Sequence, residues 1–251
     1  MKRLFAVLLS ALTITVVYSQ DISGLLKEAD SFEKQQKEPE AIDKYKQVLV
    51  SDPVQLKALV KLAELNVILG NIQTEKNNKR LYFETALSFA KRALDADNNN
   101  ADANYVMAMS AGKMTDVETD NRKIVAYVKD VKTYAEKALA INPNHGKANY
   151  VLGKWHYEMT NLSGIKKIAV KLFYGGLPDG NIESAIQYME KCKTLEPYCV
   201  PNFLDLGKAY KDNHQPTQAI ETLKRLVRLP TRTSEDPILK AEGNKLLESL
   251  Q

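Results

Sequence analysis

A tetrapeptide occurs twice in this chain, as Ala103-Asn104-Tyr105-Val106 and as Ala148-Asn149-Tyr150-Val151, with the copies 45 residues apart. Self-similarity at a period of about 20 to 50 residues is typical of stacked structural units that cannot bury their apolar faces alone. Such stacks normally present a curved binding surface rather than a catalytic pocket. The repeat therefore predicts a solenoid for most of the chain.

The small and large apolar residues around this repeat follow the spacing of the tetratricopeptide unit, a helical hairpin of about 34 residues. Small or modest side chains recur where the two helices of each unit must approach closely. The five successive pairs are Ala29 and Ala41, Ala63 and Ala86, Ala108 and Val131, Gly153 and Ala185, and Gly207 and Ala219. The predicted fold class is all-α, an α-solenoid of about five such hairpins with a C-terminal capping helix.

The middle units keep this register but are longer than the end units. The small residues of a pair are 12 positions apart in the first and last units, 23 in the second and third, and 32 in the fourth. Eleven additional residues turn a helix by three turns and roughly 20°, so the helix can absorb them and still bury the same face. We expect longer helices around Lys79–Ala96 and Arg122–Ile141.

Twenty additional residues are about half a turn out of phase, so the insertion in the fourth unit, at 160–181, should leave the helix. The sequence Gly175-Gly176-Leu177-Pro178-Asp179-Gly180-Asn181 is rich in helix-breaking residues and favours an excursion there.

The first residues have the pattern of an export signal. Lys2 and Arg3 precede an apolar run over Leu4–Val17, and Ser19 stands where a signal peptidase prefers a small side chain. We expect a signal peptide over 1–19, a mature chain beginning at Gln20, and a periplasmic or secreted location. The alternative is an uncleaved N-terminal membrane anchor, although the run is short for a membrane span.

Charge and motif content exclude several functions. The chain has a net charge of +4, of which Lys2 and Arg3 contribute two, so there is no electrostatic case for nucleic-acid binding. Its three histidines are scattered, and it has neither a phosphate-binding loop nor a nucleophile elbow. We therefore predict no enzymatic activity, no catalytic residue, no cofactor and no metal.

Cys192 and Cys199 are the only cysteines. In one interpretation Cys192 is a small packed apolar residue of its helix. In the other, the pair forms a disulfide that clamps the turn after the fourth unit in an oxidising compartment. The sequence leaves both open.

The first helices of such units line the concave surface, where we expect a protein or peptide partner. The predicted groove residues are Tyr105, Met109, Lys147, Tyr150, Lys154, Tyr157, Leu204, Lys208 and Lys211. Aromatic rings beside ammonium groups suit an acidic peptide. Alternatively, the tyrosines seal adjacent units and the lysines are ordinary solvent-exposed side chains.

A short basic segment, Ile165–Phe173, has its apolar residues on one helical face. It can pack on its own domain or make a weak contact with an anionic membrane surface.

Three stretches, with residues such as Trp155 that the tetratricopeptide pattern does not call for, resemble the regulator of microtubule dynamics family. They are Leu152-Gly153-Lys154-Trp155-His156-Tyr157-Glu158-Met159, the segment Ile165–Phe173 with the Gly-Leu-Pro turn after it, and Leu229-Pro230-Thr231-Arg232-Thr233-Ser234-Glu235-Asp236. The resemblance covers residues 101–236 and the closing helix expected at 237–251, whereas 20–100 matches only as generic repeats. It implies a helical, non-enzymatic adaptor, with members associated with microtubules or membrane contact sites. Export would place this chain away from tubulin, so the microtubule role goes with the anchored alternative.

Overall fold

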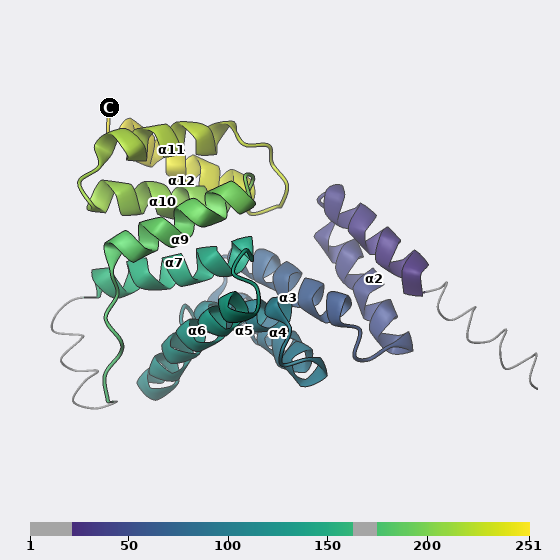
Figure 1. Cartoon of the computed structure of the whole chain (residues 1–251). Helices are drawn as coiled ribbons and strands as arrows, with labels where there is room; N and C mark the ends of the chain where they lie inside the picture. Colours follow the sequence, from purple (N-terminus) through teal and green to yellow (C-terminus); the bar gives the residue numbers. More distant parts are fainter. Residues whose placement is uncertain (1–21, 163–174) are drawn as a thin grey trace, which may run out of the picture.

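The computed structural model describes residues 22–162 and 175–251, which form helices joined by short turns, with no β-strand in these two ranges (Figure 1). The predicted signal peptide and the segment Ile165–Phe173 lie outside the described residues.

The helices pair in chain order into five hairpins, and each hairpin packs against the next. A helix over residues 22–34 pairs with α2, Glu38–Ser51. The next four hairpins are α3 (Leu56–Asn71) with α4 (Lys76–Ala96), α5 (Ala101–Met114) with α6 (Asn121–Ile141), α7 (Gly146–Asn161) with α9 (Ile182–Leu195), and α10 (Val200–Asp212) with α11 (Pro216–Arg228). The predicted solenoid is confirmed.

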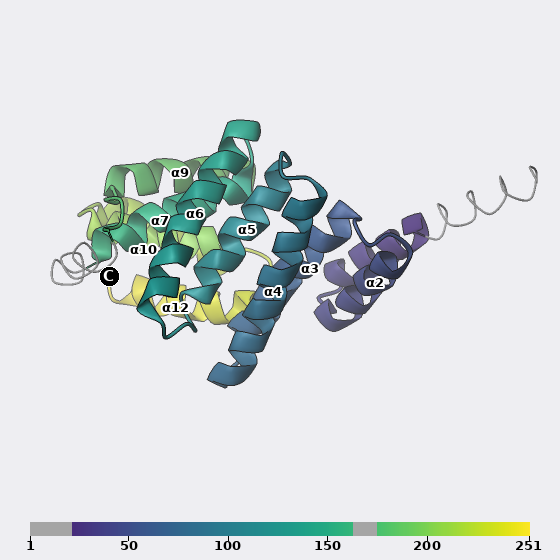
Figure 2. The ribbon, with the colours of Figure 1, turned by 90° about the horizontal axis from the view of Figure 1, so that it is seen from below.

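A final helix, α12 (Asp236–Glu248), packs against both helices of the fifth hairpin. Its Leu247 is buried with Leu204, Leu223 and Leu226, so α12 covers the apolar end of the stack as expected for a cap. Seen from below, the hairpins follow one another across the molecule from α2 to α9 (Figure 2).

The two additions of 11 residues lengthen helices, as predicted. Helices α4 and α6 each contain 21 residues, whereas α2 contains 14. In the fourth unit α7 ends at Asn161 and α9 begins only at Ile182. Gly175 and Gly176, with φ of 74° and 85°, adopt the left-handed conformation that glycine tolerates best, and the described part of this insertion before α9, residues 175–181, lies outside any helix.

Every small residue assigned to a close helix approach is buried in the structure. At Gly153 of α7, an added Cβ would lie 2.9 Å from Cγ of Met189 and 3.0 Å from the backbone oxygen of Ala185. Backbone atoms cannot move aside as a flexible side chain can, so the fourth hairpin needs a residue without a side chain here.

Consecutive hairpins are joined by a turn of repeated form. In the first four hairpins the second helix is followed by an acidic residue or asparagine, whose carbonyl accepts a hydrogen bond from the N–H three residues on. The accepting and donating pairs are Asp52 and Gln55, Asp97 and Asn100, Asn142 and His145, and Glu196 and Cys199, with N···O distances of 3.0–3.3 Å. The donating residue is in each case the N-cap of the next helix.

This turn explains the repeated tetrapeptide. Nδ2 of Asn104 donates to the carbonyls of Asn98 and Asn100, and Nδ2 of Asn149 donates to the equivalent carbonyls of Pro143 and His145. The asparagine amide therefore gives the turn carbonyl of Asn98 or Pro143 a partner, and it adds a second hydrogen bond to the N-cap carbonyl, which also accepts the backbone N–H of the same asparagine. The alanine before it and the valine two residues after it are buried in the core.

The two ends of the solenoid touch. The loop between α11 and α12 reaches the first hairpin, where the Ser234 N–H donates to Oε1 of Glu38 at 2.8 Å and Nε2 of Gln36 donates to the Thr231 carbonyl at 3.0 Å (Figure 1). Glu38 is only 4% exposed. The loop is held in shape by Asp236, whose carboxylate accepts from the Arg232 and Thr233 N–H groups. The stack is thus closed into a ring.

Two glycine-to-alanine substitutions should have opposite effects on stability. Gly153→Ala forces a Cβ onto the α9 backbone and should lower the free energy of unfolding by about 1–3 kcal/mol. Gly112→Ala in α5 meets only Cγ2 of Val131, at 3.5 Å, so the helix-propensity gain of about 0.5–1 kcal/mol should prevail. Urea unfolding of both variants measures this, and equal shifts would contradict the proposed packing at Gly153.

Candidate functional site

The concave side of the ring encloses a cavity of about 910 Å³, which we call the central cavity. Its wall is formed by the first helices of the hairpins, α3, α5, α7 and α10, and it is completed by the α11–α12 loop and α12. Apolar side chains of Leu65, Ile68, Met109, Val200 and Leu204 contribute to its lining.

Seven of the nine predicted groove residues line this cavity: Tyr105, Met109, Lys147, Tyr150, Lys154, Leu204 and Lys208. Their role in binding a partner stays a prediction. Tyr157 and Lys211 are not among the lining residues. The Tyr157 hydroxyl instead donates to Asp212 at 2.6 Å and ties α7 to the end of α10, while Nζ of Lys211 lies 3.3 Å from the same carboxylate.

The lysines of the cavity differ from the expected free ammonium groups, because carboxylates of the chain itself pair with them. Glu64 of α3 is 9% exposed, and its carboxylate lies 2.6 Å from Nζ of Lys147 and 3.3 Å from Nζ of Lys61. Burial opposes ionisation of Glu64, but the two ammonium groups outweigh it and lower its pKa from 4.5 to about 2.

Asp205 of α10 repeats this arrangement on the other side of α7. Its carboxylate lies 2.7 Å from Nζ of Lys154 and 3.6 Å from Nζ of Lys208, and it accepts a hydrogen bond from the Tyr150 hydroxyl at 2.8 Å. Burial favours the neutral acid, but Lys154 and Lys208 hold the pKa of Asp205 below its ordinary value. Helix α7 is therefore tied to α3 through Lys147 and to α10 through Lys154.

As a whole, the central cavity is formally neutral. Seven basic side chains line it, and so do seven acidic ones: Glu33, Glu64, Glu196, Asp205, Glu235, Asp236 and Glu242. A strongly acidic peptide therefore meets no net positive field, in contrast to the expectation from the lysines alone. The cavity suits a ligand that carries both charges.

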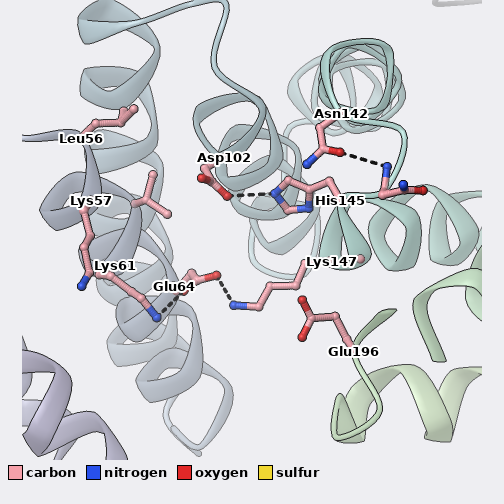
Figure 3. A pocket seen from close by; sticks show the side chains of 12 residues that line it. Leu56, Lys57, Lys61, Glu64, Asp102, Asn142, His145, Lys147 and Glu196 are labelled. Carbon is pink, nitrogen blue, oxygen red and sulfur yellow. Dashed lines mark hydrogen bonds and ion pairs between the residues drawn. The ribbon is translucent and has the colours of Figure 1, made fainter. Parts of the chain in front are cut away.

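A smaller cavity of about 480 Å³, the junction pocket, adjoins the central cavity and shares Lys61, Glu64, Lys147 and Glu196 with it. Figure 3 shows Lys147 and Lys61 reaching Glu64 from opposite sides, with Glu196 facing this group from the next junction turn. The two cavities thus meet at the Glu64 ion pairs.

His145 in the junction pocket has a structural role. Its Nδ1 accepts the Ala148 N–H at 3.0 Å as the N-cap of α7, so its proton lies on Nε2, which faces Oδ1 of Asp102 at 3.0 Å (Figure 3). This hydrogen bond lowers the pKa of Asp102. The ring also packs on Tyr105, with a centroid distance of 4.9 Å.

Tyr105 and Tyr150 both seal adjacent units and line the central cavity. Tyr105 packs against His145 of the next junction, and Tyr150 bonds Asp205 of the fifth hairpin, so each seals adjacent units. Both also line the central cavity.

Cys192 and Cys199 are free thiols in this structure. Cys192 is buried in α9, and Cys199 is partly exposed at the wall of the central cavity.

Within residues 22–162 and 175–251, no three histidine, cysteine or carboxylate side chains are grouped so that they could hold a metal ion. Among the described helices, none has both the length and the apolarity to cross a bilayer.

Glu64 and Asp205 are not among the site residues predicted from the sequence. A usable signal was present, because each is a single acidic residue between large or small apolar neighbours, as in Leu62-Ala63-Glu64-Leu65 and Leu204-Asp205-Leu206. A carboxylate in such a position is buried and needs a cation.

Comparison with known proteins gives one family. The family model described as "Regulator of microtubule dynamics protein 1-3" matches residues 25–251. Human regulator of microtubule dynamics protein 2 is 30% identical over 100 residues, covering 39% of this chain and 24% of the relative. The mouse protein 1 is 28% identical over 179 residues, covering 71% of this chain and 58% of the relative. The chain thus spans between about a quarter and somewhat over half of these relatives.

Solved structures with a similar fold include a tetratricopeptide protein and a pilus biogenesis factor. A thermophilic TPR protein of Thermus thermophilus superposes with a TM-score of 0.65 at 13% identity, over 90% of this chain and 99% of that one. The pilus factor PilW superposes with a TM-score of 0.54 at 17% identity, over 91% and 90%. At these identities the likeness establishes the fold alone.

The Glu64 ion pairs should make the free energy of unfolding depend on pH. Because the folded-state pKa of Glu64 lies below its ordinary value, its contribution is fully present above about pH 4.5 and is lost as the pH falls toward 2. Glu64→Gln should therefore reduce the free energy of unfolding by about 3 kcal/mol at pH 7 and by progressively less in acid.

Urea unfolding of wild type and variant between pH 3 and 7 measures this difference. Glu158→Gln is the matched control, because Glu158 is 55% exposed at its ion pair with Lys154 and should cost less than about 1 kcal/mol. A difference for Glu64→Gln that does not change with pH would contradict the assigned pairing.

Proposed function

This chain belongs to the regulator of microtubule dynamics protein 1-3 family, and from that premise we propose that it is a non-enzymatic binding protein whose central cavity holds a peptide segment of a partner protein. The observation that carries the proposal is the cavity itself, about 910 Å³ on the concave face of a tetratricopeptide-type solenoid. Curved repeat surfaces are used in this way for extended ligands.

The lining supports a peptide of mixed composition. The apolar side chains Leu65, Ile68, Met109 and Leu204 offer area for apolar side chains of a ligand. The paired charges at Glu64 and Asp205 are hydrogen-bonding groups fixed in place by their ion pairs, so little ordering is needed when a ligand docks. A bound segment with both acidic and basic side chains can pair its own charges with the lysines and carboxylates of these ion pairs. No buried charge is then left without an opposite charge.

A site-specific photocrosslinker tests where a partner binds. Tyr198 lines the cavity, is 47% exposed and lies in a turn, so its replacement by benzoylphenylalanine should leave the helices intact. Leu81 of α4 is 61% exposed and does not line the cavity, which makes it the matched control. We expect a crosslinked peptide segment from position 198 and none from position 81.

The crosslinked segment, synthesised as a peptide, then gives a quantitative test. Met109→Trp should fill the cavity and weaken binding at least tenfold, about 1.4 kcal/mol, whereas Leu81→Trp should not change the affinity. Isothermal titration calorimetry measures both. Equal adducts at the two positions, or an affinity that Met109→Trp does not change, would argue against the cavity as the binding site.

A second candidate function is that of a microtubule-linked regulator held at a membrane by its N-terminus, and membership of this family favours it. It requires that residues 1–19 stay on the chain, whereas an exported binding protein requires their removal. Sequencing the N-terminus of the protein from its native cells separates the two. A chain that begins at Gln20 is the expected result for export, and one that keeps 1–19 is the expected result for the anchored regulator.

A further inference from the structure

The junction pocket contains a carboxylate that has no cation of its own. Glu196 lies in the turn between α9 and α10, and Figure 3 shows its carboxylate facing the pocket across from Lys147. Nowhere in the two described ranges of the chain does an ammonium or guanidinium group form an ion pair with it. Glu64 on the facing wall, by contrast, already has two lysine partners. The carboxylate of Glu196 is therefore available to a ligand.

The chain leaves room for the Glu196 side chain at the start of α7. Gly146 is the first residue of that helix and is buried. A Cβ at this position would overlap Cγ of Glu196 and lie 3.2 Å from its Oε1. The Glu196 side chain thus packs over a residue that has no side chain, which is a use of glycine for close approach. Its place at the wall of the pocket is built into the fold.

The lysines that line the pocket do not supply the missing cation, because carboxylates already neutralise them. Each has its own partner at 2.6–3.0 Å: Asp30 for Lys57, Glu33 for Lys61 and Glu64 for Lys147. Once these pairs cancel, the charges of Asp102 and Glu196 remain. His145 does not neutralise Asp102, since it donates to that carboxylate as a neutral ring, and this hydrogen bond lowers the pKa of Asp102. The pocket and its ion pairs therefore carry an excess of negative charge.

The α3 wall of the pocket suits the hydrocarbon part of a basic side chain. Leu56 and Val60 give this wall apolar surface. The volume of about 480 Å³ lies within the range of roughly 300–1,000 Å³ that is usual for ligand pockets. Because the pocket adjoins the central cavity at Lys147 and Glu196, a side chain of a segment in that cavity can reach it. Lysine and arginine combine the apolar stem and the charged head that such a pocket fits.

We propose that the junction pocket binds a lysine or arginine side chain of the partner segment, with Glu196 as the residue that determines this specificity. The assignment rests on the proposed function, because the segment itself lies in the central cavity. The charged head pairs with Glu196 and breaks no native ion pair, while the stem packs against Leu56 and Val60. An acidic side chain would instead meet the carboxylates of Glu196 and Asp102, so the pocket discriminates by charge.

Small probes test the pocket on the full chain before any partner is known. The basic probes are N-acetyl-lysine methylamide and N-acetyl-arginine methylamide, and the uncharged N-acetyl-norleucine methylamide is the control at equal pH and ionic strength. The readout is the NMR ring signals of the histidines, because His145 lines the junction pocket whereas His156 and His214 do not. We expect a basic probe to shift the His145 signals saturably and to leave the other two in place. An equal response to the norleucine probe, or no response to either basic probe, overturns the proposal.

Two substitutions test the role of Glu196. Glu196→Gln removes the charge and should weaken binding of the basic probes by about tenfold. Gly146→Ala keeps the charge but displaces the Glu196 side chain, so it should weaken binding as well. Glu158→Gln is the matched control, because it removes a carboxylate of α7 that lines neither cavity and should leave the affinity unchanged. Circular dichroism melting checks that all three variants fold, and wild-type affinity in Glu196→Gln overturns the assignment.

This proposal and the proposed function can fail separately. A peptide crosslinked from position 198, with no response of His145 to the basic probes, keeps the central cavity as a binding site and overturns the role of the junction pocket. A saturable response of His145 without any crosslinked peptide supports the junction pocket and argues against the central cavity.

Discussion

The close approach of two helix backbones at each hairpin is the constraint on which the rest of this structure depends. Where Gly153 of α7 faces the Ala185 carbonyl of α9, an added Cβ would lie 3.0 Å from that oxygen. The paired small or modest residues of the other hairpins are buried as well, which lets the two helices of each hairpin pack closely. Because the first helices then all face one side, their polar residues converge on one cavity.

This constraint explains why the fold could be predicted from the sequence. Small residues at a fixed register identify every hairpin, and an addition of 11 residues keeps a helix face in phase, so α4 and α6 grow longer without changing the stack. The breaker-rich sequence after residue 174 identified the end of the excursion between α7 and α9. These are local properties, carried by spacing along the chain.

The candidate site could be predicted only in part, because some of its contacts join residues that are far apart in the sequence. Register along the first helices identified seven of the residues that line the central cavity, including Lys147 and Lys154. Their ion-pair partners lie on other hairpins: Glu64 is 83 residues before Lys147, and Asp205 is 51 residues after Lys154. Spacing within a helix carries no information about such pairs. Tyr157 and Lys211 fall outside the cavity because Asp212, at the end of α10, attracts both.

The contact between the first hairpin and the α11–α12 loop has a kinetic consequence. Two hydrogen bonds join chain segments that are 195 and 196 residues apart, so the cavity has a continuous rim instead of an open side. If a partner segment occupies the cavity as proposed, a free chain terminus can thread through such a rim, whereas an internal loop of a folded partner has to wait until the Glu38–Ser234 contact breaks. Exchange of such an internal segment would then be gated by the opening of the ring, and its rate would report how often these ends separate.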